Sequence, residues 1–149
     1  MEKRDPLIDR VQTALQEVIR KMQAEMLKDM NAQGITLSQF IVLSLIQKQG
    51  SCKVSELAEH MDVKPSAVTF MMDRLEQHNF IMREHDKKDR RVVNIRLTEI
   101  GEEKFQTILV ERKAIVKRYL SHLSEADLTQ FAEIAEKLAE ASALEERKE

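Results

Sequence analysis

The 149 residues carry 24 lysines and arginines and 26 aspartates and glutamates, for a net charge of −2. A hydrophobic fraction of 42% is too high for a disordered chain, and no apolar run reaches the length of a membrane span. One cysteine excludes an internal disulfide framework and no apolar signal region follows the charged start, so we expect a cytoplasmic protein. With three glycines and two prolines, turns are scarce and the fold should be mainly α-helical.

The charge is unevenly distributed along the chain. Residues 1–47 are neutral overall, residues 48–96 carry a net charge of +2, and residues 97–149 carry −4. Six of the positive charges in the middle part lie between Arg83 and Arg96. A local basic stripe governs phosphate contact more than the total charge does. The middle of the chain is therefore the candidate region for contact with nucleic acid, although a charged hairpin can also be merely solvated.

The first two predicted elements are helices. An Asp-Pro pair at residues 5–6 is typical of a helix start, and apolar residues follow at helical spacing as far as Met30. A second helix should begin after Thr36, whose side chain can form a capping box with Gln39. This helix is apolar nearly all round as far as Lys48, which is typical of a helix at the centre of its domain.

Two shorter helices follow, at about residues 54–61 and 65–77, with a three-residue turn between them; this is helix-turn-helix spacing. At 100° per residue, the second helix has an apolar inner face and a mostly polar outer face. The inner residues are Val68, Met71, Met72 and Leu75; the outer ones are Ser66, Phe70, Asp73 and Gln77, flanked by Thr69 and Arg74. Short hydrogen-bonding side chains near the start of such a helix can contact base edges. An ordinary amphipathic helix would show the same pattern.

Two strands around a charged tip should form a β-hairpin, the wing of a winged helix. The strands are predicted at residues 80–85 and 92–97, and all six residues between them are charged. Arg90 and Arg91 at this tip suit the narrow, negative minor groove of A·T-rich DNA, and Asp89 can orient Arg91 by a charge-assisted contact. A run of charges is also typical of a solvated loop.

Two long helices should complete the chain. Thr98 caps the first, and Ser124 with Asp127 marks the start of the second. Both helices, like the one at residues 8–31, carry apolar stripes that one small winged-helix unit cannot cover. A homodimer built through these helices is our interpretation. An intramolecular bundle is the alternative, less favoured because the whole winged unit separates the first helix from the last two.

Several short motifs, in a fixed order, carry a resemblance to a known family. They are Ser55-Glu56-Leu57-Ala58, Lys64-Pro65-Ser66-Ala67-Val68-Thr69, Asp73-Arg74-Leu75-Glu76 and Asp89-Arg90-Arg91, followed by Leu97-Thr98 and Gly101. Together they resemble the MarR family of bacterial transcriptional regulators. The wing motif with Leu-Thr-x-x-Gly after it is the most specific part. The order of elements fits from about Leu7 to Ala143.

The resemblance implies a single domain, residues 1–149, that acts as an obligate homodimer. Residues 36–97 would form a winged helix-turn-helix that binds double-stranded DNA, and residues 1–35 and 98–149 a helical dimerisation region. Two recognition helices about one DNA turn apart predict a pseudo-palindromic site. In the wing, Arg91 corresponds to the family's minor-groove arginine and Asp89 to its orienting partner, with Arg90 beside them.

On the recognition helix, the resemblance places Ser66, Thr69 and Phe70 at major-groove positions. Arg74 falls where the family contacts backbone phosphate, and Lys64 can reach a phosphate beside the positive end of the helix. Phe70 is unusual in this set, because an exposed aromatic ring could contact a thymine methyl group or simply pack.

Other kinds of site find little support. The peroxide-sensing members of the family carry their reactive cysteine in the first helix, so Cys52 is better interpreted as a half-buried structural thiol. The four histidines show no metal-ligand spacing. There is no glycine-rich phosphate loop and no nucleophile–base set. We therefore expect no catalytic residues, no metal and no cofactor, and a protein that is not an enzyme.

Methionines at Met22, Met26 and Met30 form a stripe along the first helix that is most simply dimer core. Methionines also line adaptable apolar pockets, and the family often binds small lipophilic or aromatic effectors. A hydrophobic effector pocket is accordingly expected near Met22, Met26, Phe40 and Leu43. The predicted function is a ligand-responsive repressor. The alternatives are a winged-helix interaction module that does not read DNA, and a regulator without an effector.

Overall fold

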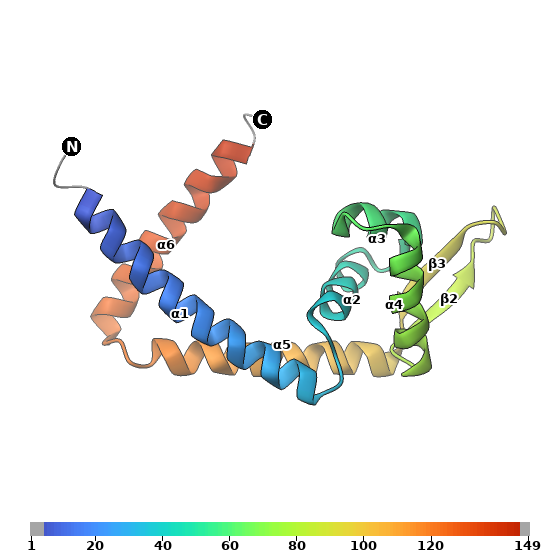
Figure 1. The fold of residues 1–149 in the computed structure, drawn as a ribbon, viewed down its shortest axis with the longest axis horizontal. Coiled ribbons are helices and arrows are strands. Elements are labelled where there is room, and N and C mark those ends of the chain that lie inside the picture. Colours follow the sequence, from blue (N-terminus) through green and yellow to red (C-terminus); the bar gives the residue numbers. More distant parts are fainter. Residues whose placement is uncertain (1–4, 147–149) are drawn as a thin grey trace. The chain divides into compact units, whose positions relative to one another are not determined.

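The computed structural model describes residues 5–146, and these residues are mostly helical, as predicted (Figure 1). In chain order, the elements are α1 (Asp5–Ala32), α2 (Leu37–Gln49), β1 (Cys52–Lys53), α3 (Val54–Met61), α4 (Pro65–Gln77), β2 (Ile81–His85), β3 (Val93–Leu97), α5 (Glu99–Leu120) and α6 (Glu125–Glu146). The predicted helices and both wing strands are confirmed, with bounds that differ by a few residues at most. None of the helices within the described range is long and apolar enough to cross a bilayer.

The chain divides into two compact units, residues 1–112 and residues 113–149. The first unit holds α1 to α4, the three strands and most of α5, and the second holds the end of α5 with α6. This division into compact units does not test the predicted roles, which are DNA binding for residues 36–97 and dimerisation for the segments on either side. These roles stay predictions at this point.

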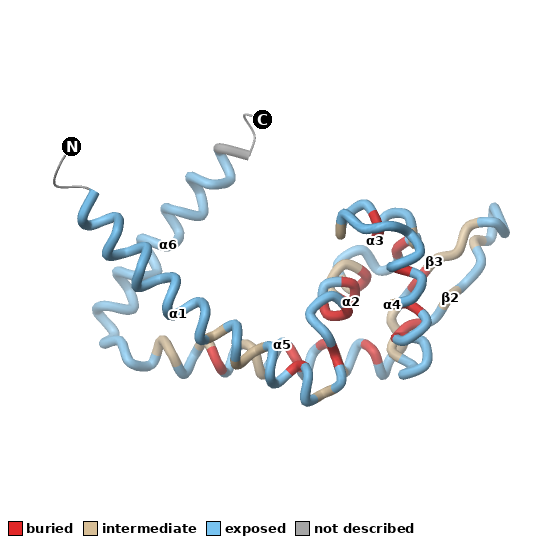
Figure 2. Tube along the Cα trace, in the orientation of Figure 1, coloured by how far each residue is buried: buried red, intermediate tan, exposed pale blue. Residues whose placement is uncertain are grey.

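The first unit is held together by a hydrophobic core centred on α2. The capping box that starts α2 is present: Gln39 N donates to Thr36 Oγ1 at 3.2 Å, and Thr36 N donates to Gln39 Oε1 at 3.0 Å. Val42, Leu43 and Ile46 of this helix are completely buried. Figure 2 shows that buried residues gather in α2, α3, α4 and the first part of α5. Most of the apolar character of α2 is therefore explained by its central position, although Leu37 and Ile41 of this helix remain 46% and 41% exposed.

The sheet has three antiparallel strands in the order β1-β3-β2. The hairpin pairs Ile81 with Leu97 and His85 with Val93, so that the predicted wing is confirmed. β1 was not predicted: its two residues are too few to show an alternating pattern, and pairing of Cys52 with Ile95 is what makes them a strand. The centre of β3 is thereby covered on both edges, and Ile95 is completely buried.

The start of α5 is fixed against the base of the hairpin. Thr98 N donates to Phe80 O at 3.1 Å, and Gly101 N donates to the capping hydroxyl of Thr98 at 3.0 Å. A Cβ atom on Gly101 would lie 1.8 Å from Phe80 O, a distance at which the backbone itself would have to move. Only glycine fits here, which gives a physical reason for the Leu-Thr-x-x-Gly motif.

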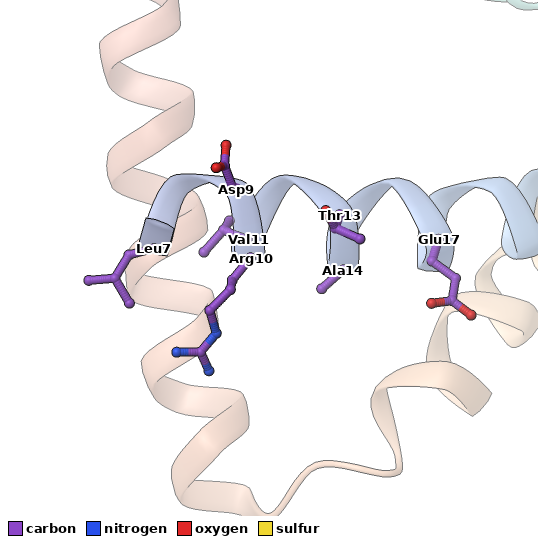
Figure 3. A pocket seen from close by; sticks show the side chains of 7 residues that line it. All are labelled: Leu7, Asp9, Arg10, Val11, Thr13, Ala14 and Glu17. Atoms are coloured by element: carbon purple, nitrogen blue, oxygen red, sulfur yellow. The ribbon is translucent and has the colours of Figure 1, made fainter. Parts of the chain in front are cut away.

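Most of the large apolar side chains that the folded chain leaves exposed, among the described residues, belong to α1 and α6. In the described residues, seven large apolar side chains of α1 and five of α6 are at least one-third exposed. They are Leu7, Ile8, Val11, Leu15, Val18, Ile19 and Leu27 in α1, and Leu128, Phe131, Ile134, Leu138 and Leu144 in α6. A shallow hollow beside the first turns of α1 is lined by Leu7, Val11 and Ala14 together with polar side chains of the same helix (Figure 3). These surfaces are unusually apolar for helices facing water.

Candidate nucleic-acid interface

The helix α4 has the two faces that its sequence predicts. Val68, Met72 and Leu75 are completely buried and Met71 is half-buried. The residues predicted to contact DNA from this helix are all exposed; they are Lys64, Ser66, Thr69, Phe70 and Arg74. Pro65 occupies the first helical position, and Lys64 caps the helix with an extended backbone. The inner face anchors α4 to the core, and the outer face is available to a partner.

The turn between α3 and α4 is closed by backbone hydrogen bonds. Asp62 adopts a left-handed conformation with φ of 51°, which aspartate tolerates better than most residues. Val63 N donates to Ala58 O at 3.1 Å. The two short helices and the three-residue turn between them agree with the predicted helix-turn-helix spacing.

A salt-bridge cluster joins α4 to the wing through Arg83 of β2. Its Nη2 lies 2.6 Å from Asp73 Oδ1, and its Nη1 lies 3.4 Å from Glu76 Oε2. The same guanidinium group lies 3.5 Å from the carbonyl oxygen of Thr69. Sequence reasoning missed this residue. The available signal was that strand alternation places Arg83 on the same face as the buried Ile81, where a lone charge requires partners.

The tip of the wing is organised by Asp86, which sequence reasoning also missed. Its carboxylate accepts hydrogen bonds from Lys88 N at 2.7 Å, Asp89 N at 3.3 Å and Asn94 Nδ2 at 3.1 Å. The bond from the Lys88 amide, followed by those from Asn94 and Asp89, holds the pKa of Asp86 below its ordinary value. An aspartate that hydrogen-bonds amides two and three residues ahead is a common device in turns.

At this tip Arg91 projects into solvent, with 92% of its side chain exposed. Asp89 Oδ1 accepts hydrogen bonds from Arg91 N at 3.0 Å and Arg91 Nε at 3.3 Å. The sequence-based expectation that Asp89 can contact Arg91 therefore agrees with the geometry. Arg90 is exposed beside it, and its carbonyl oxygen lies 2.9 Å from His85 Nδ1. In Figure 1 the hairpin tip extends away from the helices of its unit.

The middle of the outer face of α4 is apolar and aromatic. Phe70 is 62% exposed, and the guanidinium carbon of Arg74 lies 5.3 Å from the centre of its ring. The hydroxyl group of Thr69 donates to Pro65 O at 3.0 Å, one turn earlier in the helix. The hydroxyl hydrogen of Thr69 is therefore engaged, while the oxygen keeps free lone pairs.

The residues expected to form an effector pocket lie in different surroundings. Phe40 and Leu43 belong to the core, where the Phe40 ring stacks on Phe105 at 5.4 Å and lies below the Arg112 guanidinium at 4.7 Å. Met22 and Met26 are half-buried on α1. A small-molecule site near these four residues stays a prediction.

Cys52 is more buried than expected, at 2% exposure. Its Sγ lies 3.2 Å from Gln49 Oε1, and burial, followed by the nearby charge of Glu56, raises the pKa of the thiol. Both observations are typical of an unreactive structural thiol. Within residues 5–146, no group of three or more histidine, cysteine, aspartate or glutamate side chains is arranged to hold a metal ion.

Comparison with known proteins identifies the family. The model of the MarR family matches residues 35–93, from the end of the α1–α2 connection to the first residue of β3. Over 147 residues the chain is 50% identical to the HTH-type transcriptional repressor MdtR of Bacillus subtilis (strain 168), covering 99% of this chain and 95% of MdtR. The chain belongs to the MarR family. The resemblance inferred from its motifs is thus confirmed.

Solved structures agree with this assignment. The crystal structure of the YusO protein from Bacillus subtilis is 52% identical, with a TM-score of 0.84 over 92% of this chain and 97% of YusO. A MepR-like protein crystallised with pseudoligands is 38% identical, with a TM-score of 0.57 over 88% of this chain and 92% of that one. MarR-family proteins are transcriptional regulators with a winged-helix fold, and this chain has that fold.

Proposed function

We propose that this MarR-family protein is a transcriptional repressor that binds a pseudo-palindromic site in double-stranded DNA as a homodimer. The observation that carries the proposal is the pairing of an exposed outer face on α4 with a wing whose Arg91 is almost fully exposed. A repressor with 50% identity over nearly the whole chain supports the direction of regulation. The protein then acts by binding DNA in the cytoplasm and not by catalysis.

The proposed contacts divide between base recognition and phosphate binding. Ser66 and Thr69 face the major groove, and Thr69 acts there as a hydrogen-bond acceptor because its hydroxyl hydrogen is engaged by Pro65 O. Lys64, which precedes these two residues in the chain, and Arg74, which follows them, bind backbone phosphates. In the wing, Arg91 occupies the minor groove in an orientation that Asp89 supports, and Arg90 adds positive charge.

The exposed apolar faces of α1 and α6 support the proposed homodimer. Twelve large apolar side chains there are at least one-third exposed in the described chain. At roughly 1 kcal/mol each, burial of these side chains would contribute on the order of 10 kcal/mol per subunit before the entropic cost of association. A second copy offers the same apolar surface and suits a two-fold interface. The two copies then present two recognition helices to adjacent turns of DNA.

A small hydrophobic or aromatic effector is proposed to regulate binding, at a site near Met22, Met26, Phe40 and Leu43. The adaptable methionine side chains support it, as does the MepR-like relative, whose structure contains pseudoligands. Such a ligand acts by binding better to a state in which the recognition helices no longer match adjacent grooves. A regulator without an effector, and an interaction module that does not bind DNA, are the competing functions.

A mobility-shift titration tests the proposal. The full-length protein should retard a subset of genomic fragments at low salt. Arg91→Ala should weaken binding by about 1–3 kcal/mol, and Arg74→Ala should reduce the slope of log affinity against log salt by about 1. Lys48→Ala on α2 is the matched control, because it removes an exposed positive charge that belongs neither to α4 or the wing nor to the apolar faces of α1 and α6, and it should bind like the wild type. Failure to retain any fragment at low salt would remove the DNA-binding function.

A further inference from the structure

Phe70 stands out on a helix face that is otherwise polar. It is the most exposed of the five phenylalanines, at 62%, compared with 43% for Phe131 and nearly complete burial for Phe40 and Phe105. Folding of this chain leaves the ring in water, although burial of such a side chain is worth about 1.5–3 kcal/mol. Its position four residues after Ser66 puts it in the middle of the surface that meets DNA.

The ring is held in place by its own helix. Arg74 lies four residues later, and its guanidinium carbon is 5.3 Å from the ring centre, so that the cation covers one ring face. Even with this contact, Phe70 remains 62% exposed. A ring supported in this way loses less side-chain entropy on binding than a free one.

Two polar neighbours of Phe70, Asp73 and Thr69, already have partners within the chain. Asp73, three residues further along the helix, is paired with Arg83 at 2.6 Å. The hydroxyl hydrogen of Thr69 is donated to Pro65 O. Next to Phe70, Asp73 and Thr69 therefore offer acceptor oxygens but no free donor, and the ring itself is the apolar part of the outer face. Among the features of base pairs in the major groove, the 5-methyl group of thymine is the apolar one.

We propose that Phe70, supported by Arg74, is a specificity-determining residue that recognises the 5-methyl group of one thymine in each half of the DNA site. This inference rests on the proposed DNA-binding function and identifies what the middle of α4 reads. Because the contact is apolar, it distinguishes thymine from cytosine or deoxyuridine without a hydrogen bond, and it contributes little to the dependence of affinity on salt.

The test uses DNA that differs from the natural site by single methyl groups. A high-affinity duplex is first selected with the full-length wild-type protein. Each thymine is then replaced in turn by deoxyuridine, which removes only the 5-methyl group. For the wild type, one position per half-site should lower affinity by about fourfold, the equivalent of one buried methyl group. Replacement in both half-sites should lower it by about 15-fold.

Variants assign the effect to the ring. Phe70→Ala should bind the thymine duplex more weakly and should no longer distinguish thymine from deoxyuridine at that position. Phe70→Leu should retain part of the discrimination. Ser66→Ala is the matched control on the same face, and it should keep the full methyl effect whatever its overall affinity. A cytosine and a 5-methylcytosine placed at the same position should also differ for the wild type but not for Phe70→Ala.

Two outcomes would overturn the inference while leaving DNA binding intact. One is a wild-type protein whose affinity is unchanged by every deoxyuridine substitution. The other is a Phe70→Ala variant that keeps the same methyl sensitivity as the wild type. A wild-type protein that selects no duplex would instead overturn the proposed function itself, so the two failures are distinguishable.

Discussion

Replacement of Arg83 by methionine should loosen the connection between the wing and the recognition helix. In the structure this guanidinium lies 2.6 Å from Asp73 and 3.4 Å from Glu76, and its side chain is only 29% exposed. Methionine keeps the length and apolar contacts of the side chain but removes the charge. Two neighbouring carboxylates on α4 would then lack their counter-charge.

The expected loss can be worked out from the exposure of the partners. Asp73 and Glu76 are 51% and 45% exposed, so each pair is worth at most the upper end of the range for surface ion pairs, about 1 kcal/mol. The longer Glu76 contact contributes less, which gives a total of about 1.5 kcal/mol in unfolding free energy. For a chain of this length, the midpoint of thermal unfolding should fall by about 3–6 °C. The loss should shrink in high salt, which screens half-exposed charges.

A double-mutant cycle with Asp73→Asn is the appropriate measurement, read by denaturant unfolding and by DNA affinity. Arg96→Met is the matched control: its guanidinium lies 3.8 Å from Glu84 and is 56% exposed, so its loss should cost less than about 0.5 kcal/mol. If the effects of Arg83→Met and Asp73→Asn on stability simply add, the two side chains are not coupled and the reasoning about this cluster is wrong.

Three further predictions concern single positions. Gly101→Ala should destabilise the fold by about 1–3 kcal/mol in denaturant titrations, because the added Cβ meets Phe80 O, and an unchanged midpoint would contradict the packing described for α5. Asp86→Asn should speed amide hydrogen exchange at the wing tip at neutral pH. Since the pKa of Asp86 is lowered in the folded state, its stabilising effect is present above its ordinary pKa and is lost as pH falls through the lowered value. Equal exchange in both proteins at pH 7 would refute this role. Cys52 should react with a thiol reagent slowly in the native protein and rapidly after unfolding; fast native labelling would show that the thiol is accessible.

Much of the fold could be predicted from the sequence because local signals agreed with one another. Thr36 and Gln39 marked the start of α2 by a capping box, and the apolar positions of α4 had a clear helical period. β1 escaped prediction because two residues carry no periodicity. Its existence depends on β3, which lies more than 40 residues further along the chain.

The candidate site was only partly predictable for a related reason. The motif residues of α4 and the wing could be recognised one by one, together with the outward direction of Phe70. The partners of Arg83, in contrast, are ten and seven residues earlier in the chain and come into contact only when β2 packs beside α4. The hydrogen bonds that Asp86 accepts likewise depend on how the hairpin closes, because Asn94 contributes from the opposite strand.

In-vitro selection of DNA by the full-length wild-type protein tests the central claim most directly. The account predicts enrichment of a duplex with two inverted half-sites whose centres are about 10 base pairs apart, bound by two copies of the chain. It also predicts that Arg91→Ala selects the same duplex more weakly. Absence of any enriched sequence, or enrichment of a single asymmetric site bound by one copy, would contradict it.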